Sequence, residues 1–144
     1  MHNDKNATSA KLGNAGAVAR ITIDYYLDSA RLVGDLVPGD ALTALVFLTI
    51  VSRMFRSRQI AVNGGAEKRT AVTVYAVAKD LGLSYETVRR HVKRLLDAGL
   101  CERDAQGLVA PDAVFERSDF QRAISRNLEN VQSLLRRLDE SEKP

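Results

Sequence analysis

Residues 74–100, VYAVAKDLGLSYETVRRHVKRLLDAGL, restrict the possible folds more than any other stretch, because they encode two short helices joined by a tight turn. Apolar side chains recur every three or four positions in the first part, which predicts a helix ending at Leu81. Gly82 follows, and glycine ends helices readily because it enters the left-handed conformation without a Cβ penalty. Ser84 is expected to cap a second helix, and Gly99 to end it.

The second predicted helix has one apolar face and one basic face. Its apolar positions Val88, Val92 and Leu95 follow the helical period, which predicts that they are buried. The outer face and its flanks carry five charged residues, four of them basic: Glu86, Arg89, Arg90, Lys93 and Arg94. A helix with this outer charge, held by a short partner helix, is suited to lie along a phosphate-lined groove.

The flanking residues predict further elements around these two helices. Asp40 is expected to cap a long helix reaching about Arg58, apolar around almost its whole circumference, so that more than one neighbour must cover it. Residues 59–70 form a polar loop with a strong turn signal at 63–65. Two short strands around a polar turn are expected in 100–110, with a short strand at 72–73 to pair with them.

Residues 40–111 resemble the winged helix-turn-helix superfamily of bacterial transcription regulators. The matching positions are Thr73-Val74, Ala78, Leu81–Ser84, Thr87-Val88, Arg90–Val92, Leu95-Leu96 and Ala98–Leu100, with Leu100–Ala110 as the wing. The resemblance implies a mainly α fold of the α+β winged-helix type, with a three-helix core, a short β-hairpin wing and flanking N- and C-terminal helices. The size is similar to MarR-like regulators and the TVRRHV helix to GntR- or ArsR-like ones, so the subfamily stays open.

The resemblance also implies double-stranded DNA as the partner and assigns roles to ten residues. The first turns of the 84–98 helix would meet base edges in the major groove through Tyr85, Glu86, Thr87, Arg89 and Arg90. Phosphate contacts are expected from Lys93, Arg94 and Arg103, with the helix-capping Thr73 and Ser84 close to the DNA. Glu86 is expected to pair with Arg90, four residues on. For His91, a structural hydrogen bond and a DNA contact are both open.

The last predicted helix, opened by Ser118, carries a coiled-coil-like stripe. Its apolar residues recur at spacings of four, four, three, four and three: Phe120, Ile124, Leu128, Val131, Leu135 and Leu138. The stripe either folds back on its own domain or packs on a second subunit, and its length favours a homodimer. A twofold dimer would place two recognition helices about 34 Å apart on a near-palindromic site.

Four segments follow from these patterns: a disordered tail over 1–17, an N-terminal helix within 18–39, a DNA-binding domain over 40–111 and an amphipathic dimerisation helix within 112–144. The net charge is only +3, but basic residues gather near the two-helix segment, with five between 53 and 69 against Glu67 alone. The expected function is a sequence-specific DNA-binding transcriptional regulator, acting as a repressor. The alternative is a winged-helix module that binds another protein in a larger regulatory or replication assembly.

Other functions find little support in the sequence. Two histidines and one cysteine make no ligand cluster, and no nucleophile motif or phosphate loop occurs, so no metal, cofactor or enzymatic activity is expected. A small-molecule effector is left open, with Tyr25, Tyr26 and Phe47 as cavity or core residues. Cys101 is expected to be buried. The absence of an apolar leader, and an apolar run of only eleven residues at 41–51, predict a cytoplasmic, nucleoid-associated protein without a membrane segment.

Overall fold

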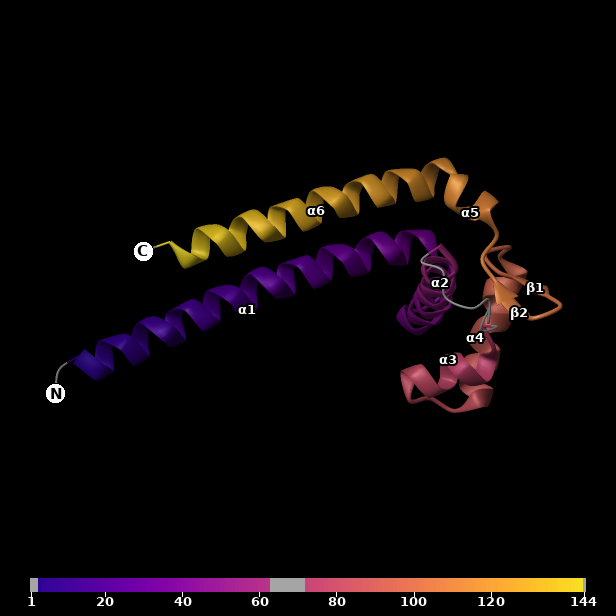
Figure 1. The fold of residues 1–144 in the computed structure, drawn as a ribbon, viewed down its shortest axis with the longest axis horizontal. Coiled ribbons are helices and arrows are strands. Elements are labelled where there is room, and N and C mark those ends of the chain that lie inside the picture. Colours follow the sequence, from indigo (N-terminus) through magenta and orange to yellow (C-terminus); the bar gives the residue numbers. More distant parts are fainter. Residues whose placement is uncertain (1–2, 63–71, 144) are drawn as a thin grey trace. The chain divides into compact units, whose positions relative to one another are not determined.

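The computed structural model describes the backbone of residues 3–62 and 72–143, and the side chains of residues 13–58 and 72–143. The chain is mainly helical with one small antiparallel sheet, as the sequence predicts for a mainly α protein. The elements, labelled in Figure 1, are α1 (Asn3–Leu36), α2 (Ala41–Val62), α3 (Val74–Leu81), α4 (Tyr85–Asp97), β1 (Glu102–Asp104), β2 (Gly107–Val109), α5 (Asp112–Glu116) and α6 (Ser118–Glu142).

The chain divides into two compact units. The core unit comprises Val33–Gln121, and the hairpin unit comprises Met1–Leu32 with Arg122–Pro144. This division differs from the predicted boundary at residue 40, because the end of α1 and the start of α6 pack into the same core as α2–α5. Val37 and Phe120 are both buried there, with Val33 and Leu36 packed against them.

The core unit is built around α2, which packs against α3 and α4. Asp40 caps α2 as predicted, because its Oδ1 accepts a hydrogen bond of 2.9 Å from the Thr43 N–H. The buried apolar side chains Val46, Ile50, Val77, Val92 and Leu95 form the centre of the core. On its edge, the ring of Phe47 meets that of Phe120 in an edge-to-face contact with centroids 6.1 Å apart.

The sheet is a two-stranded hairpin. β1 pairs with β2 in antiparallel register, with Glu102 opposite Val109 and Asp104 opposite Gly107. The strand expected at 72–73 is reduced to a single bridge, in which the Leu108 N–H donates to the Val72 carbonyl at 2.7 Å. Leu108 on β2 is buried while all three residues of β1 are exposed, so the hairpin is attached to the core through β2.

Three predicted boundaries are corrected. α1 already begins at Asn3, so residues 3–17 are helical instead of a disordered tail. The four alanines and the absence of proline permit a helix there in spite of Gly13 and Gly16. α2 continues past Arg58 to Val62, and the predicted turn at 63–65 lies outside the described residues. The expected linker after Pro111 contains the short helix α5, because proline is compatible with a helix start.

In the hairpin unit, α1 and α6 run side by side in opposite directions (Figure 1). An ion pair joins them, in which both terminal nitrogens of Arg137 lie 3.2 Å from Asp24 Oδ2. Among the described residues, no single helix is long and apolar enough to cross a membrane, although α1 and α2 taken together pass the same test of length and composition.

Candidate nucleic-acid interface

The turn between α3 and α4 is fixed by local hydrogen bonds that the sequence predicts. The Thr73 hydroxyl accepts from the Ala76 N–H at 3.1 Å and caps α3. Gly82 has φ 65°, the left-handed conformation, and the following Leu83 N–H donates to the Ala78 carbonyl at 3.0 Å. The Ser84 Oγ then accepts from the Thr87 N–H at 3.1 Å and caps α4. The two predicted helices and their turn are therefore confirmed.

α4 separates its apolar and charged residues as its spacing predicts. Val88, Val92 and Leu95 are fully buried against the core. The opposite face consists of exposed residues: Tyr85, Glu86, Arg89, Arg90, Lys93 and Arg94. The result is a strongly amphipathic helix whose outer face is basic apart from Glu86 and the last residue, Asp97.

Glu86 pairs with Arg89, not with Arg90 as predicted. Arg89 Nε lies 2.9 Å from Oε2 of Glu86, and its Nη2 lies 2.6 Å from Oε1, a bidentate geometry. Positions three and four apart share one side of a helix, and here the nearer arginine forms the pair. The guanidinium of Arg89 lowers the pKa of Glu86 through this hydrogen bond. Arg90 forms no ion pair with any residue that the structure describes, and it is therefore the arginine of this face available to a ligand.

A second polar network ties α4 to the start of α2. The Thr43 hydroxyl donates to Asp40 Oδ1 at 3.0 Å and is hydrogen-bonded to Nδ1 of His91 at 2.8 Å. Because the hydroxyl proton goes to Asp40, the proton of the second bond belongs to Nδ1 of His91. His91 is buried, so of its two open roles the structure supports the structural hydrogen bond. Arg94 Nη1 lies 3.3 Å from Asp40 Oδ2, so this predicted phosphate contact already has a carboxylate partner. The Thr43 N–H is the largest cause of the lowered pKa of Asp40.

The β1–β2 hairpin presents Arg103 to solvent. Arg103 is exposed on β1 opposite the buried Leu108. The turn between the strands is closed by Asp104, whose Oδ1 accepts from the N–H groups of Gln106 at 2.7 Å and Gly107 at 2.9 Å. Cys101, just before β1, is 2% exposed, as expected for a buried thiol, and burial raises its pKa to about 12.

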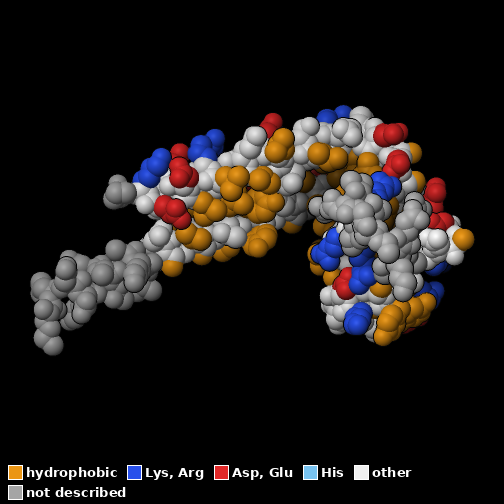
Figure 2. Space-filling view, viewed as in Figure 1, with side chains coloured by type: hydrophobic (Ala, Val, Ile, Leu, Met, Phe, Trp, Pro, Cys, Tyr) orange, Lys and Arg blue, Asp and Glu red, His pale blue; other side chains and the backbone are white. Residues whose placement is uncertain are grey.

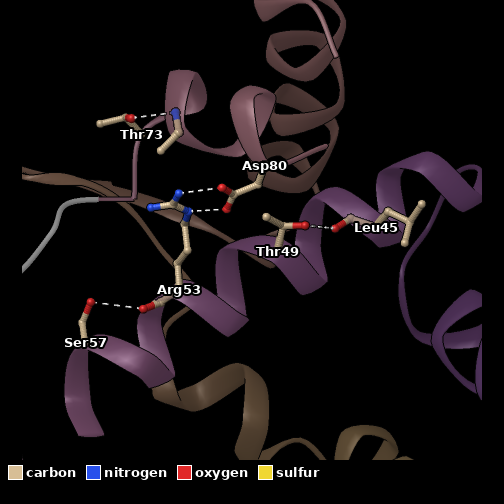
Figure 3. A network of polar contacts seen from close by, with 7 residues as sticks. Leu45, Thr49, Arg53, Ser57, Thr73 and Asp80 are labelled. Carbon is tan, nitrogen blue, oxygen red and sulfur yellow. Dashed lines mark hydrogen bonds and ion pairs between the residues drawn. The ribbon is translucent and has the colours of Figure 1, made fainter. Parts of the chain in front are cut away.

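An ion pair between α2 and α3 braces the same region (Figure 3). Arg53 Nε lies 2.6 Å from Asp80 Oδ2, and Arg53 Nη2 lies 2.8 Å from Oδ1, so one edge of the guanidinium donates two hydrogen bonds to the carboxylate. This hydrogen-bonded contact lowers the pKa of Asp80 and raises that of Arg53. Beside the pair lies an open groove of about 360 Å³, lined by Leu45, Leu48, Thr49, Ser52, Arg53, Arg56, Asp80 and Leu81.

Sequence reasoning missed one exposed aromatic residue next to the predicted site. Tyr75 stands in the first turn of α3 and is 69% exposed, and Tyr85 at the start of α4 is 53% exposed. The signal was available in the sequence, because Tyr75 comes two residues after the cap Thr73, where a helix N-terminus opens. Both phenol groups thus lie at helix starts of the same two-helix segment.

The stripe on α6 separates into three groups. Phe120 is buried in the core unit, which corrects its assignment to a dimer surface; the aromatic rings of Phe47 and Phe115 fill that position from within the chain. Val131 and Leu138 are half-buried. Ile124, Leu128 and Leu135 remain more than 50% exposed.

Tyr25, Tyr26 and Phe47, considered for an effector cavity, differ in environment. Phe47 is a core residue, whereas Tyr26 is 65% exposed and its ring lies 6.1 Å from that of Tyr25. Within the part of the chain that the structure describes, no group of three or more His, Cys, Asp or Glu side chains could hold a metal ion. Comparison with known protein families, curated proteins and solved structures finds no match.

Proposed function

We propose that this chain is a winged helix-turn-helix transcriptional regulator that binds double-stranded DNA sequence-specifically, with α4 in the major groove. The observation that carries the proposal is the exposed basic face of α4, which is held rigidly by three fully buried side chains and presents Arg90 and Lys93 to solvent. A helix of this kind, preceded by a short helix and a tight turn, supports major-groove recognition. The β1–β2 hairpin takes the role of the wing.

The contacts of each side chain suggest its role. Arg90 is the candidate for bidentate recognition of guanine. Arg89 and Glu86 act as a pair, since any base contact by one must accommodate the other. Lys93 and Arg103 hold phosphates, together with the exposed helix starts at Thr73 and Ser84. Arg94 contributes less than Lys93, because Asp40 already partners it.

The test is a titration of duplex DNA fragments, first selected from genomic DNA by binding. Arg90→Ala should lose about 1–3 kcal/mol of specific binding and relax the preference at one base pair. Lys93→Ala should weaken binding to all sequences alike and reduce the dependence of affinity on salt. Lys143→Ala, which removes the same charge near the chain end, is the matched control and should leave affinity unchanged. If the unaltered chain binds no duplex at low salt, the proposal fails.

The proposed mode of action is repression by occupying a promoter, within the cytoplasm and in association with the nucleoid. A homodimer would match a near-palindromic site, and a small-molecule effector would be a further partner. The operator sequence follows from the same selection of bound fragments.

A second candidate function is a winged-helix module that binds another protein. The α2–α3 groove favours it, because Leu45 and Leu48 are 50% and 42% exposed beside the Arg53–Asp80 pair. A defined partner whose binding survives replacement of Arg89 and Arg90 would support this candidate over DNA binding.

A further inference from the structure

The hairpin unit has two long helices and almost no core of its own. Among its described side chains, Ile21 alone is buried, at 6% exposure. Large apolar side chains face solvent instead, at exposures from 37% to 65%: Val18, Ile23, Tyr26, Leu27, Ile124, Leu128 and Leu135. Figure 2 shows hydrophobic side chains gathered along both helices of this unit. Among the described side chains of this unit, many more large apolar residues are exposed than buried, the reverse of a self-sufficient pair of helices.

Apart from Leu27, which lies about 60° around α1 from Asp24, these exposed residues lie away from the side on which α1 meets α6. Asp24 and Arg137 mark the sides on which the two helices meet. Tyr26 follows Asp24 by two residues, and Leu135 precedes Arg137 by two. Because two residues correspond to a rotation of about 200° around an α-helix, each apolar residue lies on the side opposite its charged neighbour. Both helices thus carry an apolar stripe on a side that their mutual contact leaves open.

We propose that a second copy of this chain covers both stripes, so that α1 and α6 pair with the same two helices of the partner in a four-helix assembly. Four helices can enclose an apolar core that two cannot. The proposal assigns α1 an equal share of the dimer surface, through Val18, Ile23 and Tyr26, and excludes Phe120. It deepens the proposed function, since two copies present two α4 helices, but it does not require DNA binding.

The exposed area is of the size that a stable dimer needs. An aliphatic side chain carries roughly 60–120 Å² of apolar surface and an aromatic one about 200 Å². Six aliphatic residues and Tyr26 at about half exposure therefore leave on the order of 400 Å² of apolar surface per copy. A standard interface buries about 800 Å² per partner, of which a part is polar rim. The stripes therefore supply the apolar centre of such an interface.

The surrounding charges fit a second copy better than a lipid surface. Residues 13–32 of α1 carry Arg20 and Arg31 against Asp24 and Asp28. From residue 122 on, the chain carries both signs in nearly equal number: Arg122, Arg126, Arg136, Arg137 and Lys143 against Glu129, Asp139, Glu140 and Glu142. Helices that bind anionic membranes carry an excess of Lys and Arg on the polar face. A surface with both signs in nearly equal number can instead form ion pairs with the identical surface of a second copy.

The test is sedimentation velocity of the full chain without DNA, over a range of concentrations. At micromolar concentration, the sedimentation of the unaltered chain should correspond to a mass twice the 15.8 kDa of one copy. Tyr26→Glu on α1 and Leu128→Glu on α6 should each weaken the dimer at least tenfold. Asn127→Glu is the control, because Asn127 is exposed and rotated about 100° from Leu128; it should leave the dimer intact. Where a glutamate variant loses helical signal in circular dichroism, Tyr26→Ser and Leu128→Ser replace it.

Three results would overturn the proposal. One is a chain that stays monomeric at about 100 µM, because an interface of standard size should hold two copies together at a concentration of that order. Another is a dimer that Leu128→Glu disrupts and Tyr26→Glu does not, which would confine the interface to α6. The third is association with vesicles of anionic lipid in place of dimerisation. A dimer that binds no DNA would keep this inference and refute the proposed function alone.

Discussion

Replacing Thr43 with valine tests the buried connection between α2 and α4. The Thr43 hydroxyl is fully buried and accepts from His91 Nδ1 at 2.8 Å, while its own proton goes to Asp40. Valine has nearly the same shape, so Thr43→Val removes the hydroxyl without creating a cavity. It leaves Nδ1 of His91 without a hydrogen bond at a site that is 8% exposed, where the nearest carboxylate oxygen, Asp40 Oδ1, lies 3.6 Å away.

The expected cost is about 1–3 kcal/mol of unfolding free energy, the usual penalty for a buried polar group left unsatisfied. For a chain of this length, each kcal/mol lowers the melting temperature by about 2–4 °C. Urea and thermal unfolding followed by circular dichroism measure both quantities. Because His91 lies on α4, the variant should also bind selected duplex fragments more weakly if the proposed function is right.

Thr49→Val is the matched control. It makes the same substitution on the same helix, but the Thr49 hydroxyl donates to the Leu45 carbonyl at an exposed position, so the change should stay within about 0.5 kcal/mol. Combining Thr43→Val with His91→Phe removes both polar partners and should cost less than the sum of the single variants. Equal losses for Thr43→Val and Thr49→Val would refute the reasoning.

Two further predictions concern titratable groups. Folding lowers the pKa of Asp40, so this carboxylate stabilises the fold above pH 3.8, its ordinary pKa, and the contribution is lost as the pH falls below that value. Asp40→Asn keeps a good helix cap and should therefore reduce the loss of unfolding free energy at acid pH. An unchanged acid profile would contradict this. The raised pKa of Cys101, about 12, keeps the thiol protonated, so a disulfide reagent at pH 8 should react far more slowly with the folded chain than with the chain in urea; equal rates would show an accessible thiol.

The local features of the two-helix segment were predictable because the residues that set them are adjacent in sequence. Gly82 and Ser84 define a helix end and a helix start through bonds that span no more than five residues. The two faces of α4 follow from a period of 3.6 residues. Such features depend little on the rest of the chain.

Features decided by packing between distant residues were not predictable. Phe120 continues the α6 stripe in sequence, yet its ring packs against Phe47, which is 73 residues away along the chain (120 − 47). The hydrogen bond between Thr43 and His91 joins two helices in the same way. For Glu86, the helical geometry allows either Arg89 or Arg90 as the partner. The side-chain rotamers decide between them, and the sequence does not specify these rotamers.

The contact between Arg94 and Asp40 affects the number of released cations that a salt titration of DNA binding would measure. DNA binding releases the cations condensed around each phosphate that a basic side chain neutralises. A phosphate reaching Arg94 would have to compete with a carboxylate that already neutralises the guanidinium, and the same holds for Arg89 beside Glu86. Counterion release should therefore report fewer charges than the basic residues on α4, and removing Asp40 should make the salt dependence steeper without adding a single positive charge.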